Sequence, residues 1–203
     1  NIFHQKDIEY LAIGKNIGFG AGHNTILNKI SNLSYHHLVL NPDVSFKPSV
    51  IPNLIAKLER HEIVSMIAPK VLFPNGDHQY SCRRYPRVSE LLIRRFTFLK
   101  PLFNSKINKG IYKDKDLQAS FFADYIAGCF HLYNTKDLIK LNGFDERYFL
   151  YMEDADICRE IDRLGKKKLY FPDVQIVHHH QKGSAKNLKL FWYHASSAIK
   201  YFL

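Results

Sequence analysis

The chain has 203 residues, of which 46% are hydrophobic and 24% charged, a composition that predicts one folded domain over residues 1–203 and excludes a disordered tail. Lys and Arg outnumber Asp and Glu by 29 to 19, and the net charge of +10 predicts an anionic partner such as a phosphate-bearing ligand, a nucleic acid or an acidic lipid surface. Three cysteines without a CxxC pair favour a reducing compartment, and no apolar run reaches the roughly 20 residues that cross a bilayer. We therefore expect a cytoplasmic domain, soluble or at a membrane surface.

The N-terminal half alternates predicted strands and helices. Apolar runs and turn residues predict a strand over 10–13, a helix over 21–30 after the glycine-rich KNIGFGAGHN, a buried parallel strand over 37–40, an amphipathic helix over 48–60 and a strand over 63–68. The basic stretch 84–118 follows, and its proline and lysine content predicts a variable, mobile excursion and not a separate domain.

The C-terminal half continues the alternation. The pattern predicts a strand over 121–133, helices over 136–141 and 153–164, a strand over 174–177 and a helix over 187–203. Strands alternating with helices indicate an α/β fold with a mainly parallel sheet flanked by helices. In the last helix, Leu188, Trp192 and Ile199 are more typical of core packing than of a membrane anchor. The pair Arg83-Arg84 is typical of a solvated face, although it could also steer a diphosphate.

The tripeptide NPD places Asp43 directly after the apolar run HLVL. A carboxylate just past the end of a buried strand lies where open α/β sheets bind ligands, and it can hold a hard divalent cation that in turn binds phosphate oxygens. The alternative is a plain turn, since Asn, Pro and Asp are common turn residues.

The segment FDERYFLYMEDAD concentrates five carboxylates in a basic chain. On a helix that begins near Glu153, Asp154 shares a face with Ile157, Cys158 and Ile161, whereas Asp156 shares one with Arg159 and Arg163. Asp154 is therefore expected to face inward as an ionised general base, and Asp156 outward to solvent. The alternative is that Glu153 or Asp154 only caps the helix.

Three consecutive histidines follow the apolar run VQIV. Adjacent strand residues point to opposite faces, so we expect His178 alone to reach a metal shared with a distant Asp, the alternative being a polar strand end. The glycines of KNIGFGAGHN match neither a dinucleotide fingerprint nor a Walker loop, although their backbone could approach a ligand closely.

In their order, the blocks NIGFGAGHN, VLNPDV, APKVLFPNG, QYSCRRYP, DYIAGC, GFDERYFLYMEDADICRE and VHH resemble the family-2 glycosyltransferases, and among them the bacterial rhamnosyltransferase-like branch that builds surface polysaccharides. The resemblance spans nearly the whole chain and is weakest over residues 94–118. It implies a GT-A fold, which is a Rossmann-like sheet flanked by helices. It also implies an opening nucleotide-binding strand that does not precede Asn1, so we expect a catalytic domain that is partial at its N-terminus.

The resemblance assigns roles residue by residue. NPD stands where the family has its metal-binding DxD motif, so Asp43 is expected to hold Mn²⁺ or Mg²⁺ with His178, while Glu153-Asp154 resembles the catalytic pair with Asp154 as the base. DYIAGC resembles the D-W-x-x-G-A block of the sugar pocket, with Tyr and Cys in place of the commoner Trp and Ala. The remaining residues implied in substrate binding are Asn16, Gly18, Asn24, Asp124, Gly128 and Arg159.

The function implied is inverting transfer of a sugar from a nucleotide-diphosphate donor to a saccharide acceptor, which in this branch is often lipid-linked, at the inner face of the cell membrane. Two alternatives use the same residues: a metal-dependent phosphodiesterase with Asp43, Glu153, Asp154 and His178, and an inactive homologue that only binds sugar nucleotides. A nucleic-acid-binding module is disfavoured, because the chain has no RNP-type aromatic block, zinc finger or helix-turn-helix signature.

Overall fold

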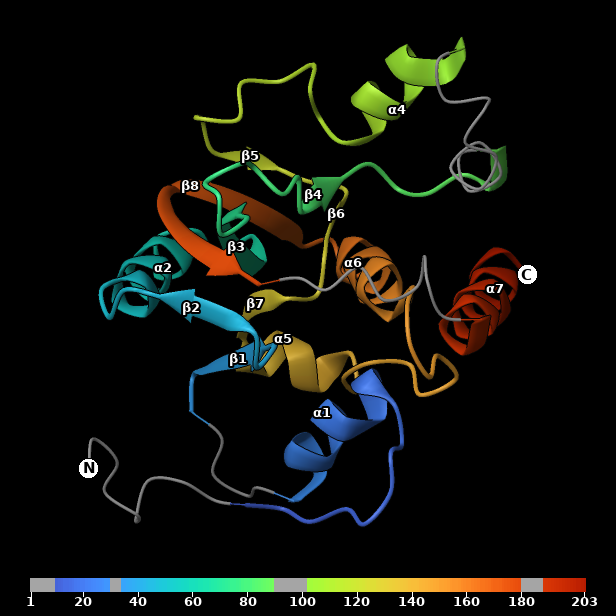
Figure 1. The fold of residues 1–203 in the computed structure, drawn as a ribbon. Helices are drawn as coiled ribbons and strands as arrows, with labels where there is room; N and C mark the ends of the chain where they lie inside the picture. Colours follow the sequence, from blue (N-terminus) through green and yellow to red (C-terminus); the bar gives the residue numbers. More distant parts are fainter. Residues whose placement is uncertain (1–9, 30–33, 90–101, 180–187) are drawn as a thin grey trace.

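The computed structural model describes residues 10–29, 34–89, 102–179 and 188–203, which form an α/β fold around one central sheet (Figure 1). The strands of this sheet follow the order β1-β7-β3-β8-β2, with β5 also paired to β8. Their bounds are β1 His36–Leu40, β2 Val44–Phe46, β3 Val64–Leu72, β5 Phe121–Phe122, β7 Phe130–Asn134 and β8 Lys167–His178. A separate two-stranded sheet pairs β4 (Cys82–Arg83) with β6 (Tyr125–Ile126).

The sheet is mixed, and the prediction of a mainly parallel sheet is wrong for the described strands. Only β3 and β8 run parallel; β1 and β3 each pair antiparallel with β7, and β2 and β5 pair antiparallel with β8. The strand predicted over 37–40 is present as β1 but is antiparallel to its described neighbour. An apolar run indicates that a strand is buried but not which way its neighbour runs, so the pattern could not have decided this.

Three other strand predictions need correction. The strand predicted over 121–133 is divided into β5, β6 and β7, because the chain turns sharply between them and the Cys129 N–H bonds the Ala127 carbonyl at 2.9 Å. Residues 10–13 form no strand, and Tyr10 is 87% exposed, so this apolar run has no sheet to join. The strands predicted over 63–68 and 174–177 are present but longer, as β3 and β8.

The helices lie close to where they are predicted. They are α1 (Phe19–Lys29), α2 (Val50–Glu59), α5 (Thr135–Lys140), α6 (Glu153–Arg163) and α7 (Leu188–Phe202). The helix α4 (Asn104–Gly110) lies within the stretch 84–118, for which no helix is predicted; residues 90–101 of that stretch lie outside the described residues. The described part packs onto the fold, because Tyr112 is buried under the Arg84 guanidinium, which pairs with Asp114 at 2.7 Å.

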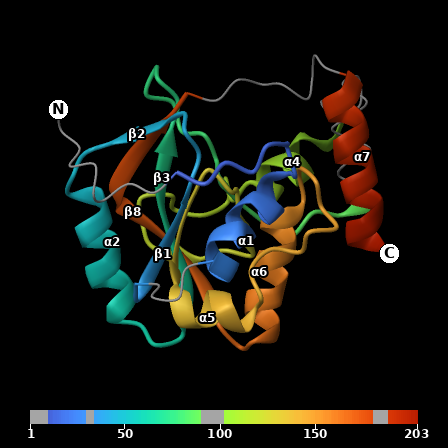
Figure 2. The ribbon, with the colours of Figure 1, turned by 90° about the horizontal axis from the view of Figure 1, so that it is seen from below.

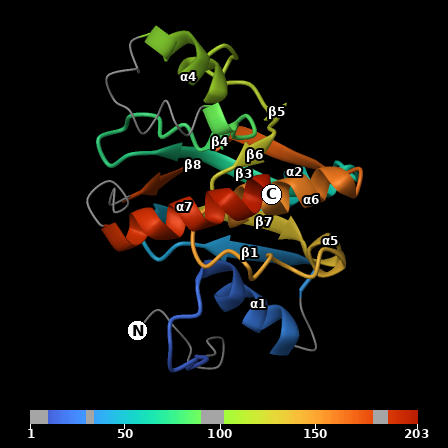
Figure 3. The same ribbon diagram turned by 90° about the vertical axis from the view of Figure 1, so that its right-hand side faces the viewer.

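Helices cover both faces of the sheet. Figure 2 shows α2 on one face and α1, α5 and α6 on the other. Side chains of β3 alternate between the two resulting cores, with Ile67 packing in the core of α2 and Met66 in the core of α6. The helix α7 lies outside these layers, at the edge of the molecule beside α6 (Figures 2 and 3). The ends of β1, β6 and β8 meet the start of α6 between the layers, and there they form the site described next.

Candidate active site

A cavity of about 410 Å³ is lined by residues from each of the seven sequence blocks. It is lined by Asn41 after β1, Gly128 between β6 and β7, His178 at the end of β8, and the Glu153-Asp154 pair at the start of α6. Segments more than 130 residues apart in the chain therefore share one concave site, as is usual for ligand sites in α/β folds.

Asp154 faces this cavity, as predicted from the helix spacing. Its Oδ2 accepts a hydrogen bond from the Gly128 N–H at 3.2 Å, and its Oδ1 accepts one from the Ala155 N–H at 2.8 Å. Burial raises the pKa of Asp154, while these two N–H groups and the Arg83 guanidinium act in the opposite direction. The result is a carboxylate held in one position with a raised proton affinity, which suits a general base.

Glu153, the neighbour of Asp154, is buried and differs from it in its hydrogen bonds. Its side chain is 6% exposed, and Oε2 has no hydrogen-bond partner among the residues that the structure describes. Burial and the neighbouring Asp154 raise the pKa of Glu153 to about 8, so its carboxyl group holds a proton near neutral pH.

The turn before the pair is strained. Tyr151 and Met152 have φ values of 69° and 71°, a left-handed backbone conformation that residues other than glycine rarely adopt. Backbone strain of this kind costs on the order of 1–3 kcal/mol per residue and concentrates at functional sites. Here it turns the chain into α6 so that Glu153 and Asp154 reach the cavity.

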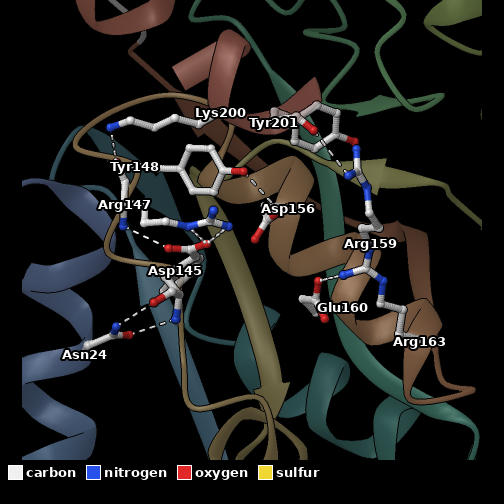
Figure 4. Close-up of polar contacts among 11 residues, drawn as sticks. Asn24, Asp145, Arg147, Tyr148, Asp156, Arg159, Glu160, Arg163, Lys200 and Tyr201 are labelled. Carbon is white, nitrogen blue, oxygen red and sulfur yellow. Dashed lines mark hydrogen bonds and ion pairs between the residues drawn. The ribbon is translucent and has the colours of Figure 1, made fainter. Parts of the chain in front are cut away.

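Asp156 is not solvated, and the prediction that it faces outward to solvent is wrong. It is 9% exposed and accepts a hydrogen bond from the Tyr148 hydroxyl at 3.3 Å (Figure 4). The acidic segment and α7 cover this side of α6, which helix spacing alone could not reveal. Burial, followed by the charges of Asp145 and Glu160, raises the pKa of Asp156.

The predicted metal pair is brought together by strand pairing. Val44 lies opposite His178 in the β2–β8 register, which sets His178 Nε2 3.3 Å from Asp43 Oδ1. Nδ1 of His178 donates to Gln79 Oε1 at 2.7 Å, because an amide oxygen can only accept. With its proton on Nδ1, the neutral form of His178 presents the Nε2 lone pair toward Asp43, the arrangement that a metal-binding histidine needs.

These residues fit a cation that is shared with a substrate. In the described ranges, no three His, Cys, Asp or Glu side chains converge as metal ligands. One carboxylate and one imidazole leave most coordination positions of Mg²⁺ or Mn²⁺ for phosphate oxygens and water. His179 instead lies near Ser45, with Nε2 3.2 Å from its hydroxyl, and His180 lies outside the described residues.

The predicted donor-binding residues of the glycine-rich block lie outside the cavity lining. Asn24 is buried and binds the backbone of Phe144 twice, accepting from its N–H at 2.8 Å and donating to its carbonyl at 2.7 Å. A Cβ on Gly18 would lie 2.4 Å from the Phe149 carbonyl oxygen, and Asn16 accepts the Gly18 N–H at 3.0 Å. This block therefore fixes the acidic segment in place, and its contact with a donor stays a prediction.

Asp124 and Arg159 also lie outside the cavity lining. Asp124 accepts the Tyr85 N–H at 3.3 Å. The Arg159 guanidinium stacks on the Tyr201 ring, 3.7 Å from its centroid, in a second cavity of about 510 Å³ between α6 and α7 (Figure 4). Their roles in substrate binding stay predictions.

Gln79 and His194 line the cavity although sequence reasoning did not single them out, and Arg83 lines it although a solvated face was the favoured interpretation of Arg83-Arg84. Gln79 sits in the quoted block QYSCRRYP, but no pattern distinguishes a residue that orients a histidine 99 positions away. Arg83 faces the cavity. Interactions with Tyr125, and after it with Asp154, raise the pKa of Arg83 above its ordinary value, although burial acts to lower it. Its neighbour Arg84 instead pairs with Asp114 at the surface. His194 of α7 reaches the cavity rim, with its ring 5.2 Å from that of Tyr151.

Known proteins resemble the chain along most of its length. No protein-family model matches it. It is 28% identical over 209 residues to "Rhamnosyltransferase WbbL" of Escherichia coli (strain K12), which covers 98% of this chain and 74% of that protein. It is 26% identical over 207 residues to "N-acetylglucosaminyl-diphospho-decaprenol L-rhamnosyltransferase" of Mycobacterium tuberculosis (strain ATCC 25618 / H37Rv), covering 95% of this chain and 66% of that protein.

The fold has a solved counterpart. The crystal structure of GalNAc-T7 with UDP, GalNAc and Mn²⁺ matches 82% of this chain and 31% of its own, with a TM-score of 0.56 and 14% sequence identity, a likeness that concerns the fold alone. The relatives that match nearly the whole chain and the GT-A fold support the resemblance indicated by the ordered motifs: the chain is similar to rhamnosyltransferases and has the fold of a GT-A glycosyltransferase.

Proposed function

We propose that the cavity transfers a sugar, with inversion, from a nucleotide-diphosphate donor to a hydroxyl group of a saccharide acceptor. One observation carries the proposal: a single cavity is lined by Asp154 and by His178, which lies beside Asp43. A base and a cation site within one cavity are what a displacement at a sugar carbon requires when the leaving group is a diphosphate.

The chemistry is a single displacement. Mn²⁺ or Mg²⁺ held by Asp43 and His178 would neutralise the donor diphosphate and stabilise it as a leaving group. Asp154 accepts the proton of the acceptor hydroxyl. The oxygen of that hydroxyl bonds to the anomeric carbon on the face opposite the diphosphate. The bond from that carbon to the diphosphate oxygen breaks, and its electron pair leaves with the nucleotide diphosphate. Arg83 contributes positive charge to the same cavity.

The two adjacent carboxyl groups raise each other's cost of ionisation, and this assigns their roles. Two neighbouring buried carboxyls disfavour each other's ionisation, so one ionises before the other. Asp154 has two N–H donors and the charge of Arg83, whereas Glu153 has its Oε2 unbonded within the described structure. Asp154 is therefore the ionised base, and Glu153 keeps the proton.

The acceptor that we propose is a lipid-linked saccharide, used in polysaccharide synthesis at the inner face of the membrane. The printed name of the mycobacterial relative describes a rhamnosyl transfer to N-acetylglucosaminyl-diphospho-decaprenol, and that relative matches 95% of this chain. This proposal implies peripheral contact with the membrane and no role for nucleic acid.

The test is a thermal-shift panel of UDP, GDP and dTDP, each with and without Mn²⁺ or Mg²⁺. A diphosphate at one hundred times its Kd should stabilise the protein by about 2.7 kcal/mol in the presence of metal. Asp43→Asn should remove the metal-dependent part, and Asp173→Asn, an exposed acid on β8, should leave it intact. No metal-dependent stabilisation with any diphosphate would refute the proposal. Hydrolysis of the donor without an acceptor would indicate the phosphodiesterase. Donor binding without turnover would indicate the inactive homologue.

A further inference from the structure

The helix α7 exposes a continuous apolar stripe. Leu188, Trp192, Ile199 and Phe202 are 72%, 64%, 60% and 37% exposed, and the terminal Leu203 is fully exposed. The first four are separated by 4, 7 and 3 positions, which places them on one side of the helix. The prediction that this helix packs into the core is therefore wrong for Leu188, Trp192 and Ile199.

The opposite side of α7 is held against the segment that leads into the active site. The Ser197 hydroxyl donates to the Leu150 carbonyl at 2.8 Å, and Ser197 is 2% exposed. Further contacts on this side are those of the Phe149 and Tyr193 rings, the Tyr151 and His194 rings, and the Arg159 guanidinium with Tyr201. These contacts fix how the helix is rotated, so the exposed apolar stripe faces away from the protein. Figure 3 shows α7 lying across the outside of the other elements.

The charges around the stripe indicate what covers it. The last 30 residues of the chain contain no Asp or Glu, and they contain Lys182, Lys186, Lys189 and Lys200. Lys189 and Lys200 are exposed on α7 itself, and the Lys200 ammonium donates to the Arg147 carbonyl (Figure 4). The guanidinium of Arg147 is already paired with Asp145 at 2.6 Å, so the two lysines supply the charge of this side. A helix with an exposed Trp-containing apolar face and lysines but no acids is typical of segments that lie in the headgroup layer of anionic membranes.

Among the described helices, none is both long enough and apolar enough to cross a membrane.

We propose that α7 is an interfacial helix that docks the enzyme on an anionic bilayer surface. Its apolar stripe enters the headgroup layer and its lysines contact acidic lipids. Since α7 contacts Leu150 and Tyr151, just before the Glu153-Asp154 pair, docking brings the cavity to the membrane surface. A lipid-linked acceptor would present its sugar hydroxyl there. The inference rests on the proposed function for the identity of this acceptor, but not for membrane binding itself.

The chain carries its own reporter, because Trp192 is its only tryptophan. The full-length protein is mixed with phosphatidylcholine vesicles with or without about one-third phosphatidylglycerol, and its fluorescence is recorded. We expect a blue shift of Trp192 emission and quenching by brominated acyl chains with the anionic vesicles only. High salt should weaken this binding, because the contribution of the lysines is screened.

A matched pair of variants tests the stripe. The double variant Leu188→Ser/Ile199→Ser keeps the reporter and should weaken vesicle partitioning at least about tenfold, since it removes two apolar side chains from the buried area. The control Leu102→Ser/Ile139→Ser, which changes side chains 78% and 54% exposed on other elements, should leave it unchanged.

The proposal would be overturned if the protein did not bind anionic vesicles, or if both double variants lost vesicle partitioning equally. It would also be overturned by a Trp192 spectrum that is already blue-shifted without lipid, because another segment or a second copy would then cover the stripe. Metal-dependent diphosphate binding, measured without lipid on the same samples, separates a failure of this proposal from a failure of the proposed function.

Discussion

Replacing Asp154 by Asn isolates its role as the base, because the two side chains have nearly the same shape. The amide oxygen can keep one of the two hydrogen bonds from the Gly128 and Ala155 N–H groups, and the amide NH₂ then opposes the other. That loss costs about 1.5–3 kcal/mol, but removal of a buried charge next to Glu153 offsets part of it. We therefore expect a folded variant whose stability differs by no more than about 2 kcal/mol from that of the parent protein.

The effect on catalysis should be much larger. Loss of a positioned general base lowers kcat by about 10²–10⁴-fold, which corresponds to about 3–5.5 kcal/mol in the activation free energy. Donor binding should change little, because Asp43 and His178 are untouched. Since burial raises the pKa of Asp154, kcat of the parent enzyme should increase with pH along an acid limb that lies above the ordinary carboxyl range.

The assay measures kcat with a synthetic acceptor and, separately, metal-dependent stabilisation by the nucleotide diphosphate. Asp156→Asn is the matched control: it changes a buried carboxyl two residues along the same helix, outside the cavity, and should keep kcat within about threefold. Near-normal kcat in Asp154→Asn would refute the assignment, as would a loss of nucleotide binding as large as the loss of kcat.

Three further changes test individual contacts. The raised pKa of Glu153, about 8, stabilises the fold at low pH, and this stabilisation is lost as pH rises through that value. Urea unfolding should therefore show the free energy of unfolding falling between pH 5 and 9 by at most about 5 kcal/mol. Glu153→Gln should flatten this pH dependence, and parallel curves for the two proteins would contradict a protonated Glu153. Gly18→Ala places a methyl group against a backbone carbonyl at φ 98° and should lower the free energy of unfolding by about 3 kcal/mol or more. The control Gly22→Ala, with open space around it in α1, should raise the free energy of unfolding by about 0.5–1 kcal/mol. Equal effects of the two variants on Tm would refute the tight contact at Gly18. Gln79→Leu removes the acceptor that orients His178 and should weaken metal affinity about 10–100-fold, read from the metal concentration that gives half of the thermal shift; unchanged affinity would refute that role.

The sequence predicted the parts of the site that depend on local spacing. Helix periodicity correctly predicted that Asp154 faces inward, because the residues that share its face are its near neighbours in α6. It failed for Asp156, since the cover over that side comes from Tyr148 and from α7, which begins more than 30 residues later. Periodicity gives the angle between two side chains, but not what lies against either of them.

Contacts between distant segments were predictable only in part. The meeting of Asp43 and His178 depends on the β2–β8 register, and the order of the motifs indicated it where strand patterns could not. The stripe of α7 was visible as a pattern, but its direction depends on Ser197 and Tyr201, which are buried against partners elsewhere in the chain. A pattern with an apolar side and a polar side normally buries the apolar one, and here the polar side faces the protein.

The state of the acidic segment explains how a cluster of carboxylates can sit beside a site for an anionic donor. Three of its five acids take part in hydrogen bonds or ion pairs that hold the fold, and these are Asp145, Glu146 and Asp156. Glu153 keeps its proton near neutral pH, so it contributes no charge. Asp154 lines the cavity with the N–H donors and the Arg83 charge that favour its ionised form, and Arg83 would offset that negative charge there. In the proposed function a diphosphate would therefore meet little repulsion, and Asp154 would supply the carboxylate that an acceptor hydroxyl needs.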